Sequence, residues 1–437
     1  MKRILILIFS NFGVKIVTIL YGVLGARLLG PELKGIYALV LLLPSLYVSF
    51  FDFGIGQASV YFFKKKDLDV KQSFSSLVAF TAFLSVIVPI ALLLLQPVLR
   101  LLFPLIKDAW IFYLSILIYP FLLFQTYASV FVLAINYVKR YSLIWFCKEL
   151  VSLLLISILY VLHIKSIGLM LAVYMTTNIA SCLVLYFTIN SKVRFSKKDV
   201  SVPIVKKLVS YGYKFNILSI LQWVYYKVNF IIVGIFIMDP AQLGIFSVAS
   251  SFADLMFIIS SSATSILFID EATAKDEKGS AAKFDKVRLN IKMLMLLMVA
   301  VGILAVLFGY PAILIMYSRA YINAYYPLVI LIPGNIVFSI YKLYGSLIAA
   351  SGKPEKLIGI SFIAMLGSII LNILAVPRYG IIGAAFATSI SYTIAAIITV
   401  VIYKRLKKCT IKEMLLLNRN EFAYVQSKIL QLRRFGR

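Results

Sequence analysis

Long apolar runs follow one another through almost the whole sequence, and they limit the possible folds more than any other feature. Twelve such segments begin near residues 4, 35, 73, 110, 141, 167, 212, 243, 289, 322, 356 and 380. Many exceed the roughly 18 residues that an α-helix needs to cross a membrane. Because 62% of the 437 residues are apolar and only 14% are charged, a soluble domain could not bury the apolar surface. The sequence therefore predicts an all-α polytopic membrane protein with about twelve transmembrane helices.

A short turn motif occurs twice, half a chain apart, at residues 25–35 and 234–244. Each copy begins and ends with glycine and has a proline between an apolar run and the next one. Glycine lets backbones approach closely, and proline fixes φ where no helix needs to continue. The duplication predicts two pseudo-symmetric six-helix bundles around a central cavity, formed by residues 1–200 and 206–405. Residues 406–437 are predicted to be a basic amphipathic cytoplasmic tail.

The formal charge of +27 raises the question of a nucleic-acid partner, and the distribution of charge along the chain answers it. If the N-terminus is cytoplasmic, only seven of the 44 Lys and Arg residues lie in external loops: Arg27, Lys34, Arg100, Lys107, Lys165, Arg319 and Arg378. This asymmetry is the positive-inside rule and requires no polyanion. We therefore expect no nucleic-acid partner, and we expect both termini on the cytoplasmic side.

The rare residue types exclude several chemistries. Cys147, Cys182 and Cys409 are odd in number and lie in predicted helices or on the cytoplasmic side, so a disulfide framework is not expected. His163 is the only histidine, which excludes a histidine-based metal site or catalytic triad. Most predicted external loops are also too short to hold an enzyme site. The sequence predicts no catalytic residue, no metal and no cofactor.

Charged residues inside the predicted helices are the candidates for function. The lysines are Lys15, Lys148, Lys214, Lys227, Lys292 and Lys342. Only three acids lie in the predicted helices and could neutralise these lysines: Asp52, Glu149 and Asp254. A charge at the membrane centre costs at least about 2.5–3.5 kcal/mol on insertion scales, so such residues normally face a bundle interior or water. Lys214 and Lys292 lie near cytoplasmic ends, where we expect their side chains to extend to the membrane surface.

The other four lysines lie at staggered depths and form what we call the lysine ladder: Lys15, Lys148, Lys227 and Lys342. Asn11, Trp223, Asn335 and Ser339 fall on polar stripes of the same helices and complete the predicted substrate-binding set. The alternative for each lysine is a structural ion pair, although three acids cannot neutralise the whole set. The acids are candidates for ion pairing or for coupling. Asp52 and Asp254 each end the pattern Ser-x3-Ser-x2-Asp, which is either a second duplicated feature or a chance match.

Several motifs resemble the polysaccharide-export branch of the multidrug/oligosaccharidyl-lipid/polysaccharide flippases. They are Ala26-Arg27-Leu28-Leu29-Gly30-Pro31 followed by Gly35-Ile36-Tyr37, Asp52-Phe53-Gly54-Ile55-Gly56, Gly352-Lys353-Pro354, and the stretch from Pro377 to Ala385. The resemblance runs from residue 4 to about residue 405. It implies two six-helix bundles that face each other across a V-shaped cavity, which opens alternately to each side.

The resemblance also implies a substrate and a location. O-antigen and capsule members of the family carry undecaprenyl-pyrophosphate-linked repeat units outward across the bacterial cytoplasmic (inner) membrane. Lysine ammonium groups would hold the pyrophosphate. Expected partners are the lipid-linked oligosaccharide and membrane lipids, with a polysaccharide polymerase and chain-length proteins as candidates. Alternatives are a multidrug or cation antiporter, a lipid II-type exporter and, from another class, a membrane glycosyltransferase or polymerase.

Overall fold

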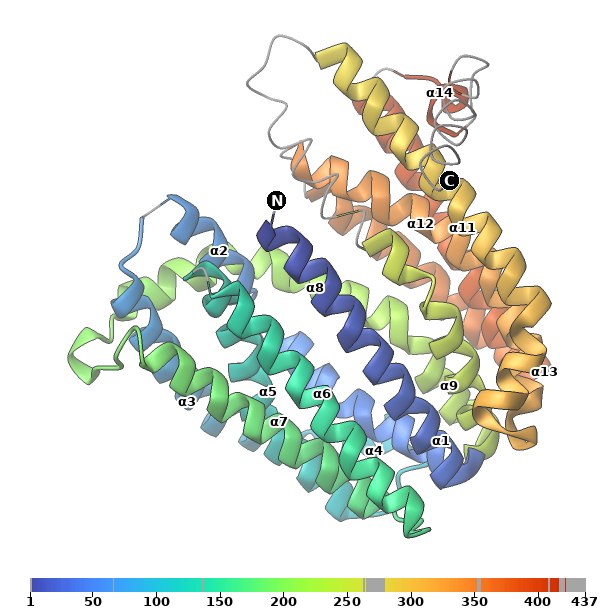
Figure 1. Ribbon diagram of the computed structural model, residues 1–437, viewed down its shortest axis with the longest axis horizontal. Helices are drawn as coiled ribbons and strands as arrows, with labels where there is room; N and C mark the ends of the chain where they lie inside the picture. Colours follow the sequence, from blue (N-terminus) through green and yellow to red (C-terminus); the bar gives the residue numbers. More distant parts are fainter. Residues whose placement is uncertain are drawn as a thin grey trace, which may run out of the picture. The chain divides into compact units, whose positions relative to one another are not determined.

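The computed structural model describes residues 2–65, 67–135, 137–261, 264, 280–351, 355–407, 409–415 and 421. These residues are almost entirely helical, and no strand occurs within these ranges (Figure 1). Among them, nine helices are long and apolar enough to cross a membrane, by length and composition. The prediction of an all-α polytopic fold is confirmed. The family-like motif Gly352-Lys353-Pro354 lies outside the described residues.

Most of the described helices follow one another closely along the chain. The first part of the chain contains α1 (Lys2–Phe51), α2 (Ile55–Lys65), α3 (Val70–Leu94), α4 (Gln96–Leu102), α5 (Ala109–Ala134), α6 (Val138–Val161), α7 (Ile167–Asn190) and the 3-10 turn η1 (Lys197–Asp199). The second part contains α8 (Val202–Ile237), α9 (Pro240–Asp254), α11 (Ser280–Tyr317), the 3-10 turn η3 (Arg319–Ala324), α12 (Tyr325–Ala350), α13 (Glu355–Lys407) and α14 (Ile411–Leu415).

Two of the long helices each cover two predicted spans, because each continues through a kink at a glycine. The kink in α1 is at Gly30, with φ 73°, and the kink in α13 is at Gly380, with φ 59°. Glycine adopts this left-handed region without the strain that a side chain would impose. Gly30 lies within the first copy of the predicted turn motif, and Gly380 lies within the family-like stretch from Pro377 to Ala385.

Backbone contacts divide the chain into two compact units. Unit 1 comprises Met1–Val248, Pro311–Ala324 and Ile373–Ala384, and unit 2 comprises Ala249–Tyr310, Tyr325–Asn372 and Ala385–Arg437. Within unit 1, α8 packs against α1, α2 and α3, although it follows the predicted boundary between the halves. The six-helix halves therefore remain a prediction from the duplication.

The core of unit 1 forms where α1 packs along α6 and α5, with α7 against both of those helices (Figure 1). Two of the hydroxyl groups buried in this core illustrate how it is held together. The Tyr47 hydroxyl lies 3.2 Å from Ser115 Oγ, and the Tyr321 hydroxyl donates to the Ala26 carbonyl at 2.8 Å. Because apolar surface is not driven together in lipid as it is in water, such interhelical hydrogen bonds and close packing hold the helices in place.

In unit 2, the segment after α13 packs back on the bundle. Thr410 and Glu413 form a capping box at the start of α14, because each side chain accepts a hydrogen bond from the other's backbone amide. The bond from the Thr410 amide holds the pKa of the Glu413 carboxyl below its usual range. Met414 is fully buried, and its carbonyl accepts a 2.8 Å hydrogen bond from the Tyr344 hydroxyl. The predicted amphipathic face beyond residue 421 lies outside the described residues.

The predicted topology can be tested by labelling single cysteines in a variant in which Cys147, Cys182 and Cys409 are replaced. Lys197→Cys, in η1, is expected to resist an impermeant maleimide in intact cells and to react after lysis, because the positive-inside rule places this loop in the cytoplasm. Lys165→Cys is the external control and should react in intact cells. Ready labelling of position 197 in intact cells would contradict the whole topology.

Candidate functional site

The second predicted span is broken at Asp52, where α1 gives way to α2. Phe53 and Gly54 both have left-handed backbone conformations, with φ of 52° and 63°. Asp52 Oδ1 accepts hydrogen bonds from the Gly54 amide and from Asn216 Nδ2, each at 2.8 Å. The Tyr127 hydroxyl donates to the Asp52 carbonyl at 2.7 Å. The carboxylate therefore caps the break and connects α8 to α1, rather than pairing with a lysine.

The second copy of the Ser-x3-Ser-x2-Asp pattern also ends a helix. α9 ends at Asp254, and Leu255 and Met256 form a turn in which each amide bonds to the carbonyl three residues before it. Both copies of the pattern thus mark a helix break, which favours duplication over a chance match. Their surroundings differ, because Asp254 is exposed in unit 2 whereas Asp52 is 7% exposed in unit 1.

Further contacts hold α8 against α1 and α2. Trp223, predicted to contact substrate, is buried and donates from Nε1 to Ser45 Oγ at 3.0 Å. Nearer the start of α8, Gly212 lies so close to Gly54 that a Cβ on either residue would clash with backbone atoms of the other helix. Only glycines permit this approach, which fixes the position of α2 against α8.

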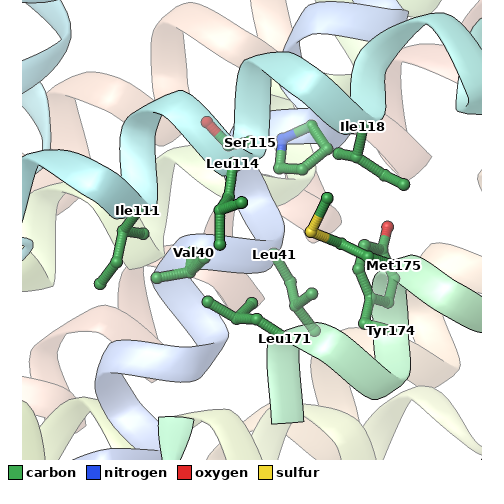
Figure 2. A pocket seen from close by; sticks show the side chains of 10 residues that line it. Val40, Leu41, Ile111, Leu114, Ser115, Ile118, Leu171, Tyr174 and Met175 are labelled. Atoms are coloured by element: carbon green, nitrogen blue, oxygen red, sulfur yellow. The ribbon is translucent and has the colours of Figure 1, made fainter. Parts of the chain in front are cut away.

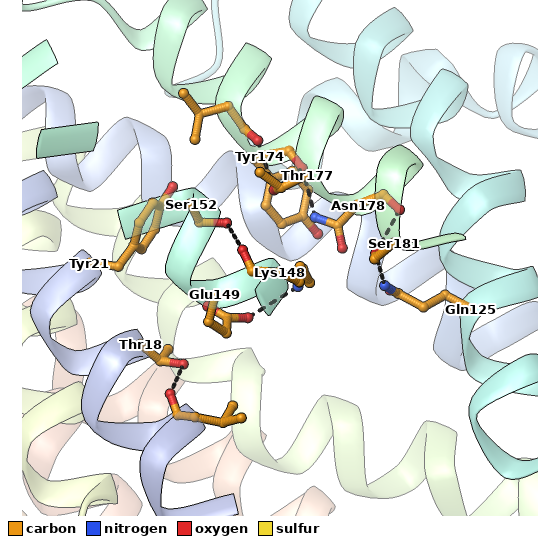
Figure 3. Close-up of polar contacts among 12 residues, drawn as sticks. Thr18, Tyr21, Gln125, Lys148, Glu149, Ser152, Tyr174, Thr177, Asn178 and Ser181 are labelled. Carbon is orange, nitrogen blue, oxygen red and sulfur yellow. Dashed lines mark hydrogen bonds and ion pairs between the residues drawn. The ribbon is translucent and has the colours of Figure 1, made fainter. Parts of the chain in front are cut away.

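Lys148 and Glu149 form an ion pair of 3.2 Å in the interior of unit 1 (Figure 3). Their side chains are 12% and 14% exposed. Adjacent helical residues point about 100° apart and need not meet, yet these two bend towards each other. Lys148 Nζ also lies 4.9 Å from the centre of the Trp145 ring. Lys148, a member of the lysine ladder, is therefore already neutralised by an acid.

The polar groups beside this pair are mostly satisfied within unit 1. Gln125 Nε2 donates to Ser181 Oγ at 2.6 Å and joins α5 to α7 (Figure 3). The hydroxyls of Tyr21 and Tyr37 are 2.8 Å apart. A small hollow between α1, α5 and α7 is lined by Val40, Leu41, Pro44, Ile111, Leu114, Ser115, Ile118, Leu171, Tyr174 and Met175 (Figure 2). This lining contains no charged side chain, so the hollow does not suit an anion.

The other lysines of the ladder lie in different surroundings, and two of them, Lys15 and Lys227, have no carboxylate partner among the described residues. Lys15 is exposed and makes no hydrogen bond or ion pair within the described part of the chain. Lys227 is half-buried, with Nζ 5.6 Å from the centre of the Phe230 ring. In unit 2, Lys342 Nζ lies only 3.6 Å from the centre of the Phe257 ring. Aromatic faces attract cations without neutralising their charge.

The remaining predicted residues are placed as follows. Asn335 and Ser339 are buried in α12 of unit 2, where Ser339 Oγ donates to the Asn335 carbonyl at 3.0 Å. Asn335 Nδ2 is buried without a hydrogen-bond partner among the described residues, so this amide can donate to a ligand or to water. Asn11 lies in α1, but its side chain is outside the described residues. The predicted set is thus divided between the two units.

One prediction about the lysines is wrong. Lys292 was expected to extend to the membrane surface, but it is 3% exposed and its Nζ lies 2.8 Å from Glu421 Oε2. Its partner belongs to the segment after α14, more than a hundred residues away in sequence. Lys214, for which the same was expected, is exposed on α8.

Comparison with solved structures shows which proteins share this fold. The chain is similar to the lipid II flippase MurJ in an inward closed conformation, with a TM-score of 0.75 and 17% identity over 98% of this chain and 93% of that one. It is also similar to an inward-facing multidrug resistance MATE family transporter of the MOP superfamily, with a TM-score of 0.70 and 15% identity over 91% and 96% of the two chains. The fold is that of the superfamily which the motifs resemble, as expected.

Sequence comparison then gives the family. Residues 24–325 match the family described as polysaccharide biosynthesis protein, and the chain belongs to this family. It is also similar to the probable low-salt glycan biosynthesis flippase Agl15 of Haloferax volcanii, with 24% identity over 211 residues. That match covers 48% of this chain and 44% of the relative, so it spans less than half of either length.

Proposed function

We propose that this protein is a flippase that moves undecaprenyl-pyrophosphate-linked oligosaccharide repeat units from the cytoplasmic to the external leaflet by alternating access. We expect its substrates to be O-antigen or capsule repeat units. We expect it to act in a bacterial cytoplasmic membrane. Membership of a polysaccharide biosynthesis family supports the pathway. The fold and a relative named as a flippase support a transporter rather than an enzyme.

The observation that carries this proposal is the excess of intramembrane lysine over available carboxylate in unit 1. Asp52 accepts its hydrogen bonds from Gly54 and Asn216, and Glu149 pairs with Lys148. Neither acid neutralises Lys15 or Lys227, and neither lysine has another acid partner in the described ranges. Since an unneutralised charge in a membrane protein normally faces water or a ligand, these lysines are suited to an anionic substrate.

A pyrophosphate moving outward travels with an inside-negative membrane potential, which contributes up to about 2.3 kcal/mol per charge per 100 mV. The protein therefore mainly needs to lower the desolvation barrier at the membrane centre. Lysines at staggered depths would do so by offering the anion one counter-charge after another. An ammonium group is a compact, rotatable donor, so it can release the pyrophosphate again. Sugar hydroxyls would meet amide and hydroxyl groups such as Asn335, while the polyprenyl tail stays in lipid.

The lysine ladder is tested by complementation of a flippase-null strain, corrected for membrane abundance. Lys15→Gln, Lys227→Gln and Lys342→Gln are each expected to reduce polysaccharide export, and the triple variant should reduce it at least about tenfold, because anion contacts are lost at several depths. The corresponding Arg variants should retain part of the activity. Lys206→Gln is the control and should export normally, because Lys206 is exposed and belongs to neither the ladder nor its polar neighbours. Full complementation by the triple variant would end the ladder hypothesis.

A further inference from the structure

The ends of α2 and α8 that are predicted to face the cytoplasm carry lysines mounted on aromatic rings. We name this cluster the lysine–tyrosine platform; it consists of Tyr61, Phe62, Lys65, Lys207, Tyr211 and Lys214. The rings of Tyr61 and Tyr211 are stacked, with centres 4.4 Å apart and planes 16° apart. Lys65 Nζ lies 4.7 Å from the centre of the Tyr61 ring, and Lys207 Nζ lies 4.6 Å from the centre of the Phe62 ring.

The rings hold the ammonium groups in place. The side chain of Tyr61 hydrogen-bonds Lys65 and raises the pKa of its ammonium group above the usual value. The close approach of Gly54 to Gly212, two to three turns away along α2, fixes the two helices that carry the cluster. Long lysine side chains normally lose rotamer freedom when they bind a ligand. Here part of that freedom is already lost, which distinguishes these lysines from mobile anchors at a membrane surface.

The charge balance of the platform favours an anion. Lys65, Lys207 and Lys214 are exposed. The negative charge of Asp67 also raises the pKa of the Lys65 ammonium group, after the larger effect of Tyr61. Several ammonium groups around one pair of rings match a ligand with several charges on neighbouring phosphates better than a singly charged phosphodiester.

We propose that the lysine–tyrosine platform is a docking site at which the pyrophosphate headgroup of the lipid-linked substrate binds before it enters the membrane. This inference rests on the proposed function and adds a site outside the lysine ladder. α2 precedes the predicted boundary between the halves, and α8 is the first helix after it. A headgroup bound here therefore contacts both halves of the duplicated chain at the start of the transport cycle.

The test measures binding to the full-length protein in nanodiscs of phosphatidylcholine. The probe is a short-chain polyprenyl pyrophosphate that carries one sugar. The Lys65→Gln/Lys207→Gln variant should bind the probe about tenfold more weakly, since two charge-assisted contacts to the phosphates are lost. Tyr61→Leu should weaken binding about threefold through loss of the ring that positions Lys65, and Tyr61→Phe less. Lys206→Gln is the matched control and should bind as the unaltered protein does.

Equal affinity of the double variant and the unaltered protein would overturn the docking site. Nanodiscs doped with phosphatidylglycerol provide the second arm of the test. A general site for anionic lipid would lose the probe to phosphatidylglycerol at equimolar amounts, and that result would also overturn the docking site.

The outcomes distinguish the docking site from the proposed function. If ladder variants lose export while the Lys65/Lys207 variant binds and exports normally, only the docking site fails. If the unaltered protein neither binds the probe nor restores export, the proposed function fails.

Discussion

Gly35→Ala and Gly244→Ala are each expected to remove most of the correctly folded protein from the membrane. A Cβ on Gly35 would clash with the carbonyl of Pro240, and a Cβ on Gly244 would clash with the carbonyl of Pro31. Backbone atoms cannot relieve a clash by changing rotamer, as a flexible side chain can. Therefore α1 and α9 would have to separate. Overpacking of this kind costs about 3 kcal/mol, which is a large part of the stability of most proteins.

The measurement is the monodisperse fraction of a fluorescent fusion after detergent extraction, together with its thermal midpoint. Gly22→Ala is the matched control on the same helix, because a Cβ there meets no atom within 4 Å. The double variant should be less destabilised than the sum of the two single ones, since one separation of the helices relieves both clashes. Single variants as stable as the control would show that the two helices do not meet in this way.

Glu421→Gln is expected to destabilise the protein by about 3 kcal/mol, because it leaves the ammonium group of Lys292 without its counter-charge. The side chain of Lys292 is 2% exposed, and breaking a buried pair on one side costs more than removing both charges. The variant Lys292→Met/Glu421→Met should accordingly recover most of the stability. Thermal unfolding of the purified protein is the measurement.

A second ion pair of the same segment serves as the control. Arg288 and Glu413 are 3.1 Å apart, with side chains 22% and 46% exposed, so Glu413→Gln should destabilise the protein much less than Glu421→Gln does. Glutamine also preserves the capping box with Thr410. Equal effects of Glu413→Gln and Glu421→Gln would mean that Lys292 is solvated, as the sequence had suggested.

The sequence predicted those features of the fold that depend on neighbouring residues. Apolar run lengths indicated the spanning helices, and glycine with proline marked the positions where α1 and α13 change direction, at Gly30 and Gly380. The repeated turn motif indicated a duplication whose two copies touch in the structure at Gly35 and Gly244. Helical periodicity and residue type were sufficient for these predictions, because each depends on a short stretch of chain.

The partners of charged residues could not be predicted in this way. Asp52 bonds to Asn216, which is 164 positions away, and Lys292 pairs with a residue 129 positions away. No periodicity relates such distant residues. The break at Asp52 was also missed, although the dipeptide Phe53-Gly54 after an acid was a usable signal, because glycine readily adopts the left-handed conformation found there.

The contact between the two turn motifs has a consequence for the ancestry of the chain. Gly35 meets Pro240 while Gly244 meets Pro31, so the contact is the same from either side. This is the geometry of an isologous interface across a two-fold axis. With six predicted spans each, both halves enter the membrane in the same direction, as two subunits of a parallel homodimer would. In a half-length ancestor, one mutation would have altered both sides of this contact at once. In the single chain each side can change alone, and here both sides have a glycine and a proline.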